Sequence, residues 1–84
     1  MDDLKELPNV GQVLHGALLE VGIATAEELR TVGAETAFLR IRAQVDSGAC
    51  LHMLYGIQGA IDGVRDNLLP QEKKDRLRAF YKNL

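Results

Sequence analysis

A chain of 84 residues can bury one modest core but has little room for a deep catalytic cleft beside it. Its content of 46% hydrophobic and 26% charged residues excludes an intrinsically disordered chain, and its single cysteine excludes an internal disulfide. The net charge of −2 is uneven: residues 1–35 carry −5 and residues 36–84 carry +3, so affinity for polyanions is expected in the second part.

The chain begins Met1-Asp2-Asp3 and lacks the basic and apolar regions of a signal peptide. The longest nearly apolar stretch, residues 49–61, is interrupted by polar residues and glycines. It falls short of the roughly 20 residues that span a bilayer. We therefore predict a cytoplasmic protein without a membrane span.

The first predicted helix covers residues 9–21. Apolar residues recur there at helical spacing on one face: Val10, Leu14, Ala17, Leu18 and Val21. Gly22 follows the last of them and precedes apolar Ile23. This order predicts a Schellman-type C-cap in which the glycine takes the left-handed conformation.

A capping box is predicted at the start of the second helix. The Thr25 hydroxyl would accept a hydrogen bond from the Glu28 amide, and the Glu28 carboxylate would accept one from the Thr25 amide. This helix should begin at Ala26 and end at Gly33. A third helix is expected over residues 35–44, with core positions at Phe38, Ile41 and Val45.

Residues 49–64 are apolar on almost every side, which predicts a central, buried fourth helix. Leu69-Pro70 opens the fifth helix, with Pro70 at its first helical position. The inner stripe of that helix would be Leu77, Phe80, Tyr81 and Leu84. No segment shows the strict alternation of a half-buried strand. The predicted fold is all-α, a compact bundle of five short helices in one domain over residues 1–84.

Four glycines fall inside predicted helices: Gly16, Gly56, Gly59 and Gly63. Each costs about 1 kcal/mol relative to alanine there, so a compensating role is expected. We predict close helix crossing, in which the first or third helix approaches the fourth at Gly56 or Gly59.

Residues 7–11, Leu-Pro-Asn-Val-Gly, and residues 22–29, Gly-Ile-Ala-Thr-Ala-Glu-Glu-Leu, flank the first helix. Together they resemble the helix-hairpin-helix pattern, so the N-terminal unit is expected to be helix-hairpin-helix-like. With residues 32–40, 51–61 and 69–70 in order behind them, the chain resembles the C-terminal domain of the TfoX (Sxy) regulators of bacterial competence. The resemblance covers residues 4–77.

The resemblance implies a helical, non-enzymatic regulatory domain. Two-domain members of that family act as positive regulators of DNA-uptake genes, reportedly together with a transcription factor, and 84 residues leave no room for their N-terminal domain. The expected partner is therefore a protein, either a separate chain like the TfoX N-terminal domain or a transcription regulator. A homo-oligomer stays open as well.

A nucleic-acid alternative follows from the hairpin resemblance. In DNA-binding helix-hairpin-helix domains, backbone amides at a helix N-terminus approach a phosphate. The corresponding amides here belong to Val10, Gly11, Gln12 and Val13. Against this interpretation, Asn9 replaces the first glycine of the pattern, and the surrounding residues are net acidic. The other interpretation is a tight turn that starts the helix.

A second candidate surface is basic and consists of Arg40, Arg42, Lys73, Lys74, Arg76, Arg78 and Lys82. It would bind nucleic acid or an acidic protein patch, or else be an ordinary solvated face, since Glu72 and Asp75 are interleaved with it. Leu19, Leu39 and Met53 fall outside the main core stripes, and would either form an apolar patch for a partner or complete the core.

Catalytic, metal and cofactor sites are not expected. Cys50 and His52 are two residues apart and His15 is distant, which is not the paired spacing of a zinc motif. Nothing adjacent to Cys50 in the sequence indicates an orienting base for nucleophilic catalysis. The prediction is a binding domain without enzymatic activity.

Overall fold

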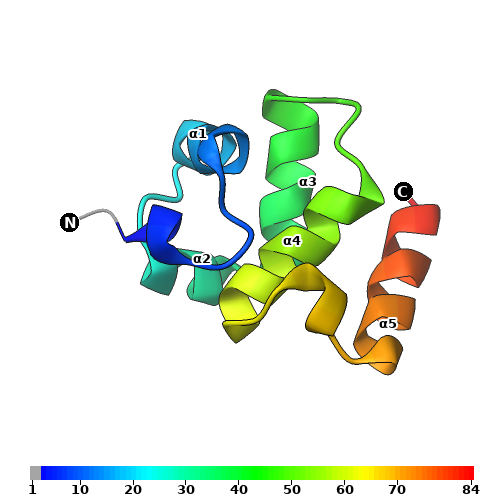
Figure 1. Cartoon of the computed structure of the whole chain (residues 1–84). Helices are drawn as coiled ribbons and strands as arrows, with labels where there is room; N and C mark the ends of the chain where they lie inside the picture. The colour runs from blue at the N-terminus through cyan, green and yellow to red at the C-terminus, as the bar shows by residue number, and fades with distance from the viewer. Residues whose placement is uncertain (1–2) are drawn as a thin grey trace.

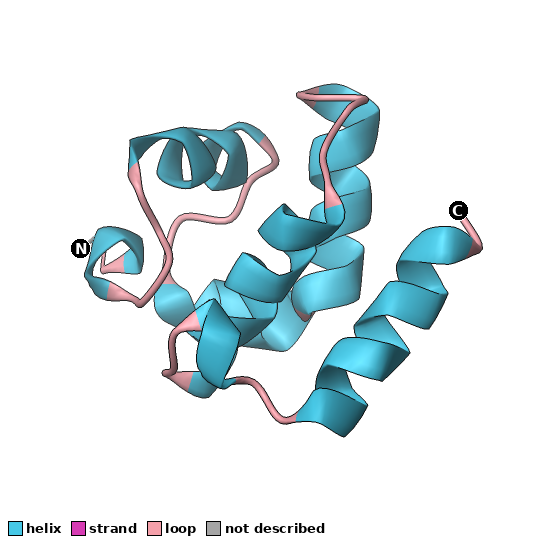
Figure 2. Ribbon diagram, turned by 45° about the vertical axis from the view of Figure 1, so that its right-hand side comes forward, coloured by secondary structure: helices cyan, strands magenta, loops and turns pink. Residues whose placement is uncertain are grey.

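Helices are the only regular secondary structure in the computed structural model, which describes residues 3–84 (Figures 1 and 2). The elements are η1 (Leu4–Glu6), α1 (Gln12–Glu20), α2 (Ala26–Val32), α3 (Ala34–Gln44), α4 (Leu51–Asp62), η2 (Asp66–Leu68) and α5 (Gln71–Lys82). The radius of gyration of 11.6 Å matches the value of about 12 Å expected for a globular chain of this length. The predicted compact, all-α bundle is confirmed.

Helix α4 lies at the centre of the bundle, as predicted. It contacts α2, α3, α5 and η2, and in Figure 1 it runs between the N-terminal helices and α5. Leu54, Ile57 and Ala60 are 0% exposed. Phe38 and Ile41 of α3, the helix that α4 contacts, belong to the same hydrophobic cluster and are equally buried.

The predicted helix ends at Gly22 and Gly33 are confirmed, because both glycines have positive φ, 83° and 87°. At Gly22 the Ile23 amide donates to the Leu18 carbonyl at 2.9 Å and the Gly22 amide to that of Leu19 at 3.1 Å. This is the hydrogen-bond pattern of a Schellman motif.

The capping box of α2 forms in part. The Glu28 amide donates to the Thr25 hydroxyl at 3.1 Å, as predicted. The Glu28 carboxylate, however, accepts from the Ala24 amide at 2.9 Å and not from the amide of Thr25. Asp3 supplies a cap that the sequence did not predict, since its carboxylate accepts from the Ala26 amide at 2.8 Å. Met1 and Asp2, used above for the localisation prediction, lie outside the described residues.

The first helix begins at Gln12 and not at Asn9, a correction with a backbone cause. Asn9 has a φ of 69°, which is incompatible with a right-handed helix, and Gly11 is extended. The predicted core residues of α1 are nevertheless buried, and Leu4 of η1 joins them at 0% exposure.

Other boundaries also differ from the prediction. Helix α4 starts at Leu51 and stops at Gly63, which is left-handed with φ 76° and therefore ends the helix; it does not lie within it. Pro70 lies one residue before the first helical residue of α5, where its carbonyl accepts from the Lys73 and Lys74 amides.

Two of the apolar positions behave differently from what periodicity predicted. Val45 and Leu84, predicted to face the core, are 39% and 46% exposed because each follows the last turn of its helix. The 3-10 helix η2 was not predicted and exposes Leu68. Within residues 3–84, every helix is too short or too polar to cross a bilayer.

Candidate functional site

Asn9 connects the segment before α1 to the middle of α4 and to the residues that follow it. Its side-chain Nδ2 donates to the carbonyl of Gly56 at 3.3 Å and to that of Val64 at 2.9 Å. Its Oδ1 accepts from the Asp66 amide at 3.1 Å. Asparagine tolerates a positive φ better than most residues, and its side chain can form hydrogen bonds with backbone groups. Asn9 therefore combines a left-handed backbone with three hydrogen bonds.

The glycines of α4 make space for this side chain. A Cβ at Gly59 would lie 2.5 Å from Asn9 Nδ2 and 2.6 Å from the Val64 carbonyl oxygen. A Cβ at Gly56 would be in ordinary contact with Asn9, at 3.6 Å from its Cβ. A close approach is therefore present at Gly59, but the group that approaches is a loop side chain and not a crossing helix. At Gly16, which is exposed, a Cβ would meet nothing within 4 Å, so no close approach compensates for this glycine.

A groove of about 620 Å³ lies between the start of α1 and the start of α4, and Asn9 belongs to its lining. Its walls come from residues 9 and 11–14, from residues 50, 52, 53 and 56, and from residues 65 and 66 after α4. Leu14 forms part of its buried side, and Met53 is half-buried. Val13 stands out into solvent with 79% exposure.

The electrostatics of this groove are set by two helix ends and three side chains. Neither α1 nor α4 has a side-chain N-cap or an acidic residue in its first turn. The partial positive charge of both N-termini is therefore uncompensated by the helices' own residues. Asp66 Oδ2 lies 3.2 Å from Nε2 of His52, whose side chain is 81% exposed. Arg65 is exposed and forms no ion pair within residues 3–84.

Three of the four residues proposed for phosphate contact line the groove: Gly11, Gln12 and Val13. Val10 does not, because its side chain is 9% exposed within the core and its amide donates to the Leu7 carbonyl at 3.4 Å. Contact of these amides with a phosphate stays a prediction. The lining also contains one arginine, Arg65, for which the sequence predicted no role.

The predicted basic surface is divided between α3 and α5. Lys73 is paired with Asp62 at 2.7 Å, and Arg78 with Asp75 at 2.7 Å. These carboxylates neutralise part of the charge that a polyanion would require. Arg40 is exposed on α3, beside Leu39, which is 40% exposed. Binding by this surface also stays a prediction.

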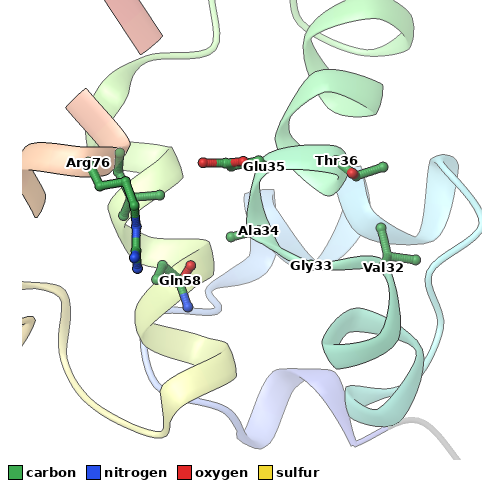
Figure 3. Close-up of a pocket in the computed structure, with 8 residues that line it drawn as sticks. Val32, Gly33, Ala34, Glu35, Thr36, Gln58 and Arg76 are labelled. Carbon is green, nitrogen blue, oxygen red and sulfur yellow. The ribbon is translucent and has the colours of Figure 1, made fainter. Parts of the chain in front are cut away.

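A second hollow of about 360 Å³ lies where α2 passes into α3 (Figure 3). Residues 32–36 form one side, and Gln58 of α4 with Arg76 and Leu77 of α5 form the other. Figure 3 shows Glu35 extending from the first turn of α3 toward the side that carries Arg76. Glu35 places a carboxylate at this helix N-terminus, whereas the first turns of α1 and α4 at the groove hold no acidic residue.

Sequence reasoning missed the contribution of Asn9, Arg65 and Asp66 to the site. The signal for Asn9 was present, because asparagine stood where the hairpin pattern has glycine. No local signal marked the other two. Among residues 3–84, no group of three or more His, Cys, Asp or Glu side chains is placed to hold a metal ion.

A family comparison places the chain among known sequences. The model of the TfoX C-terminal domain matches residues 1–81. Protein Sxy of Escherichia coli K12 is 36% identical over 81 residues, which are 96% of this chain and 38% of that protein. The DNA transformation protein TfoX of Haemophilus influenzae is 34% identical over 77 residues, which are 92% of this chain and 35% of that protein. The chain thus spans little more than a third of the length of these relatives.

Solved structures share the fold at higher identity. An uncharacterized protein from Listeria monocytogenes, in a triclinic crystal, superposes with a TM-score of 0.92 at 44% identity, covering 95% of this chain and 90% of that one. A protein of unknown function from the same organism, in a tetragonal crystal, superposes with a TM-score of 0.90 at 43% identity, covering 94% of this chain and 96% of that one. In both, the fold accounts for nearly the whole solved chain.

Proposed function

Because this chain belongs to the TfoX C-terminal domain family, we propose that it is a non-catalytic regulatory adaptor that works by binding a protein partner. The observation that carries this proposal is the extent of the match. In Escherichia coli Sxy and Haemophilus influenzae TfoX, the matched region is 38% and 35% of a longer protein. Because the domain is joined to other protein segments in those relatives, a protein is the expected class of binding partner for it here.

The partner class that fits best is a chain like the remaining part of those relatives, or a transcription regulator. One relative is a DNA transformation protein by name. We therefore place the regulation of DNA-uptake genes within the proposal.

A specific observation favours one alternative, a helix-hairpin-helix DNA contact. The N-terminus of α1 carries no side-chain cap, and Gly11, Gln12 and Val13 line the groove next to it. However, the first 35 residues are net acidic, and affinity for duplex DNA depends on Lys and Arg that displace counterions. Protein binding is the better supported of the two.

The test is a pull-down with the tagged chain from its source cell, with and without nuclease, at several salt concentrations. We expect a retained protein that survives nuclease and persists as salt rises. A complex made through six or more phosphates would instead lose about a thousandfold or more in affinity between about 50 and 200 mM salt. Retention of nucleic acid alone, with that salt dependence, would replace the adaptor proposal by the DNA-binding one.

A further inference from the structure

We propose that the groove between the N-termini of α1 and α4 is the docking site for the protein partner. Its occupant would be a partner segment that presents an apolar side chain next to a carboxylate. This inference rests on the proposed function, because it assumes that the partner is a protein. It adds the surface, the anchor residues and the chemistry of the segment that binds.

Val13 provides the apolar contact. At 79% it has the highest exposure of the large hydrophobic residues on the described surface, and it projects from the first turn of α1. Met53 of α4, half-buried, lies on the same groove, and Leu14 forms its buried side. Methionine packs adaptably against varied side chains. An apolar side chain inserted here would remove the Val13 side chain from water. Burial of apolar surface is the main favourable term in most protein–protein association.

The charges of the groove favour a carboxylate beside that apolar side chain. The helices α1 and α4 begin at the groove without side-chain caps, whereas α2 has Thr25 as its cap and two glutamates in its first turn. Arg65 adds a full positive charge and is unpaired within residues 3–84. The groove's acidic residue, Asp66, already lies 3.2 Å from His52. A partner carboxylate would thus meet positive potential from the two helix N-termini and from Arg65, opposed by the single carboxylate of Asp66.

The groove is also preformed. Asn9 fixes the segment before α1 to the carbonyls of Gly56 and Val64 and to the Asp66 amide. These bonds hold both walls of the groove before any partner arrives, which lowers the entropy lost on binding.

A duplex is the less suitable occupant of this groove. Nucleic-acid surfaces gain affinity by collecting several Lys and Arg side chains along a phosphate backbone. Here Arg65 is the lone Lys or Arg in the lining, and Val13 and Met53 would face phosphates with apolar surface. A protein segment that combines an apolar group with one acid matches both features.

The first test uses a random 12-residue peptide library displayed on phage and selected on the immobilised chain. We expect the enriched peptides to place an apolar residue next to Asp or Glu. Val13→Asp should weaken the best peptide at least tenfold, and selection on Arg65→Glu should enrich basic peptides in place of acidic ones. Matched controls outside the groove, Leu68→Asp at an apolar residue that is 66% exposed and Arg40→Glu at an exposed arginine, should bind as the unmodified chain does.

The second test uses Cys50, the chain's one cysteine, which is exposed on the wall of the groove. Its reaction rate with a small disulfide reagent should fall several-fold when the best synthetic peptide is added. The same peptide should give no protection on Arg65→Glu. The docking site is disproved if selection enriches no such peptide. It is equally disproved if enriched peptides leave the Cys50 rate unchanged or bind Val13→Asp normally, or if duplex DNA displaces them.

Failure of the groove and failure of the adaptor function are separable. If a cellular protein is retained equally by the unmodified chain and by Val13→Asp, the adaptor function stands and the groove is not its docking site. If the unmodified chain retains no protein at all, the adaptor function fails, whatever the peptides do.

Discussion

At the scale of single residues, Asn9 makes long-range side-chain contacts that none of the predicted motifs included. Its side chain makes hydrogen bonds to groups 47, 55 and 57 residues away, and its φ of 69° turns the chain toward them. The Leu-Pro-Asn-Val-Gly segment is therefore a specific attachment to α4 as well as a turn before α1. Asparagine in place of the pattern's glycine adds these bonds while it keeps the left-handed backbone.

Replacing Asn9 with alanine should lower the free energy of unfolding by about 2–4 kcal/mol. The change removes three hydrogen bonds, each worth about 0.5–1.5 kcal/mol. It also places alanine, which disfavours the left-handed region more than asparagine does, at a positive φ. Urea denaturation followed by circular dichroism measures the loss. Asn9→Gly keeps the backbone conformation and should lose less; equal losses for both variants would contradict a contribution from φ.

Gly59 and Gly16 form a matched pair within helices. Gly59→Ala should destabilise by about 1–3 kcal/mol, because its Cβ would lie 2.5 Å from Asn9 Nδ2 and 2.6 Å from the Val64 carbonyl. Gly16→Ala should stabilise by about 0.5–1 kcal/mol, since a Cβ there meets nothing within 4 Å and alanine favours the helix. Thermal melts of the two variants decide the matter. A stabilising Gly59→Ala would show that the close approach at α4 is not required.

At the scale of elements, local capping chemistry sets the ends of α1 and α2. Gly22 and Gly33 stop them because both adopt positive φ, and Thr25 starts α2 through its hydroxyl. The Asp3 carboxylate on the Ala26 amide then fixes the N-terminal segment to the same helix start. One short helix thus has two caps, one local and one from a segment 23 residues earlier.

Thr25→Ala should therefore cost about 1 kcal/mol of unfolding free energy, with a range of about 0.5–2 kcal/mol. Thr25→Ser retains the accepting oxygen and should recover most of the loss. Thr31→Ala, at an exposed position inside the same helix, is the control and should change stability by less than about 0.5 kcal/mol. Chemical denaturation of the three variants measures the differences. Similar losses at positions 25 and 31 would argue against the cap.

At the scale of the whole molecule, one hydrophobic cluster joins η1 and the five α-helices of the described residues. It includes Leu4 before α1, Ile57 in α4 and Leu77 in α5, each at most 2% exposed. Helix α5 is held on the outer side of α4 (Figure 2), where the Tyr55 hydroxyl donates to the Lys74 carbonyl at 3.4 Å and the Phe38 and Tyr81 rings lie 6.0 Å apart. A shared core of this kind favours unfolding in one step.

Ile57→Ala should lower stability by about 2–5 kcal/mol, a large part of the 5–15 kcal/mol typical of a small domain. Unfolding followed by far-ultraviolet circular dichroism and by tyrosine fluorescence should give coincident transitions in the unmodified chain and in the variant. Leu68→Ala, at 66% exposure, should change stability by less than about 0.5 kcal/mol. Separate transitions for the two probes would show that α5 and the N-terminal helices unfold independently.

The sequence by itself determined the fold class, the order of the five α-helices and, to within one residue, the end of α1 and both ends of α2 and α3. Apolar spacing located the buried faces at Leu18, Phe38 and Ile57, because burial repeats with the period of the helix. Glycines at 22 and 33 and the threonine at 25 acted on residues next to them, so their effects are local and readable. The same local method misplaced Gly63 inside α4, since a long apolar stretch gives no sign of where the chain turns back.

Only the tertiary structure decided how the site is assembled. The attachment of Asn9 to Gly56, Val64 and Asp66 joins segments about fifty residues apart, and no periodicity reports a hydrogen bond across that distance. The same holds for the groove, whose walls come from the beginnings of α1 and α4 and from residues 65 and 66 after α4. Sequence pattern records which face of a helix avoids water, whereas the juxtaposition of two helix ends depends on packing that every other helix helps to set.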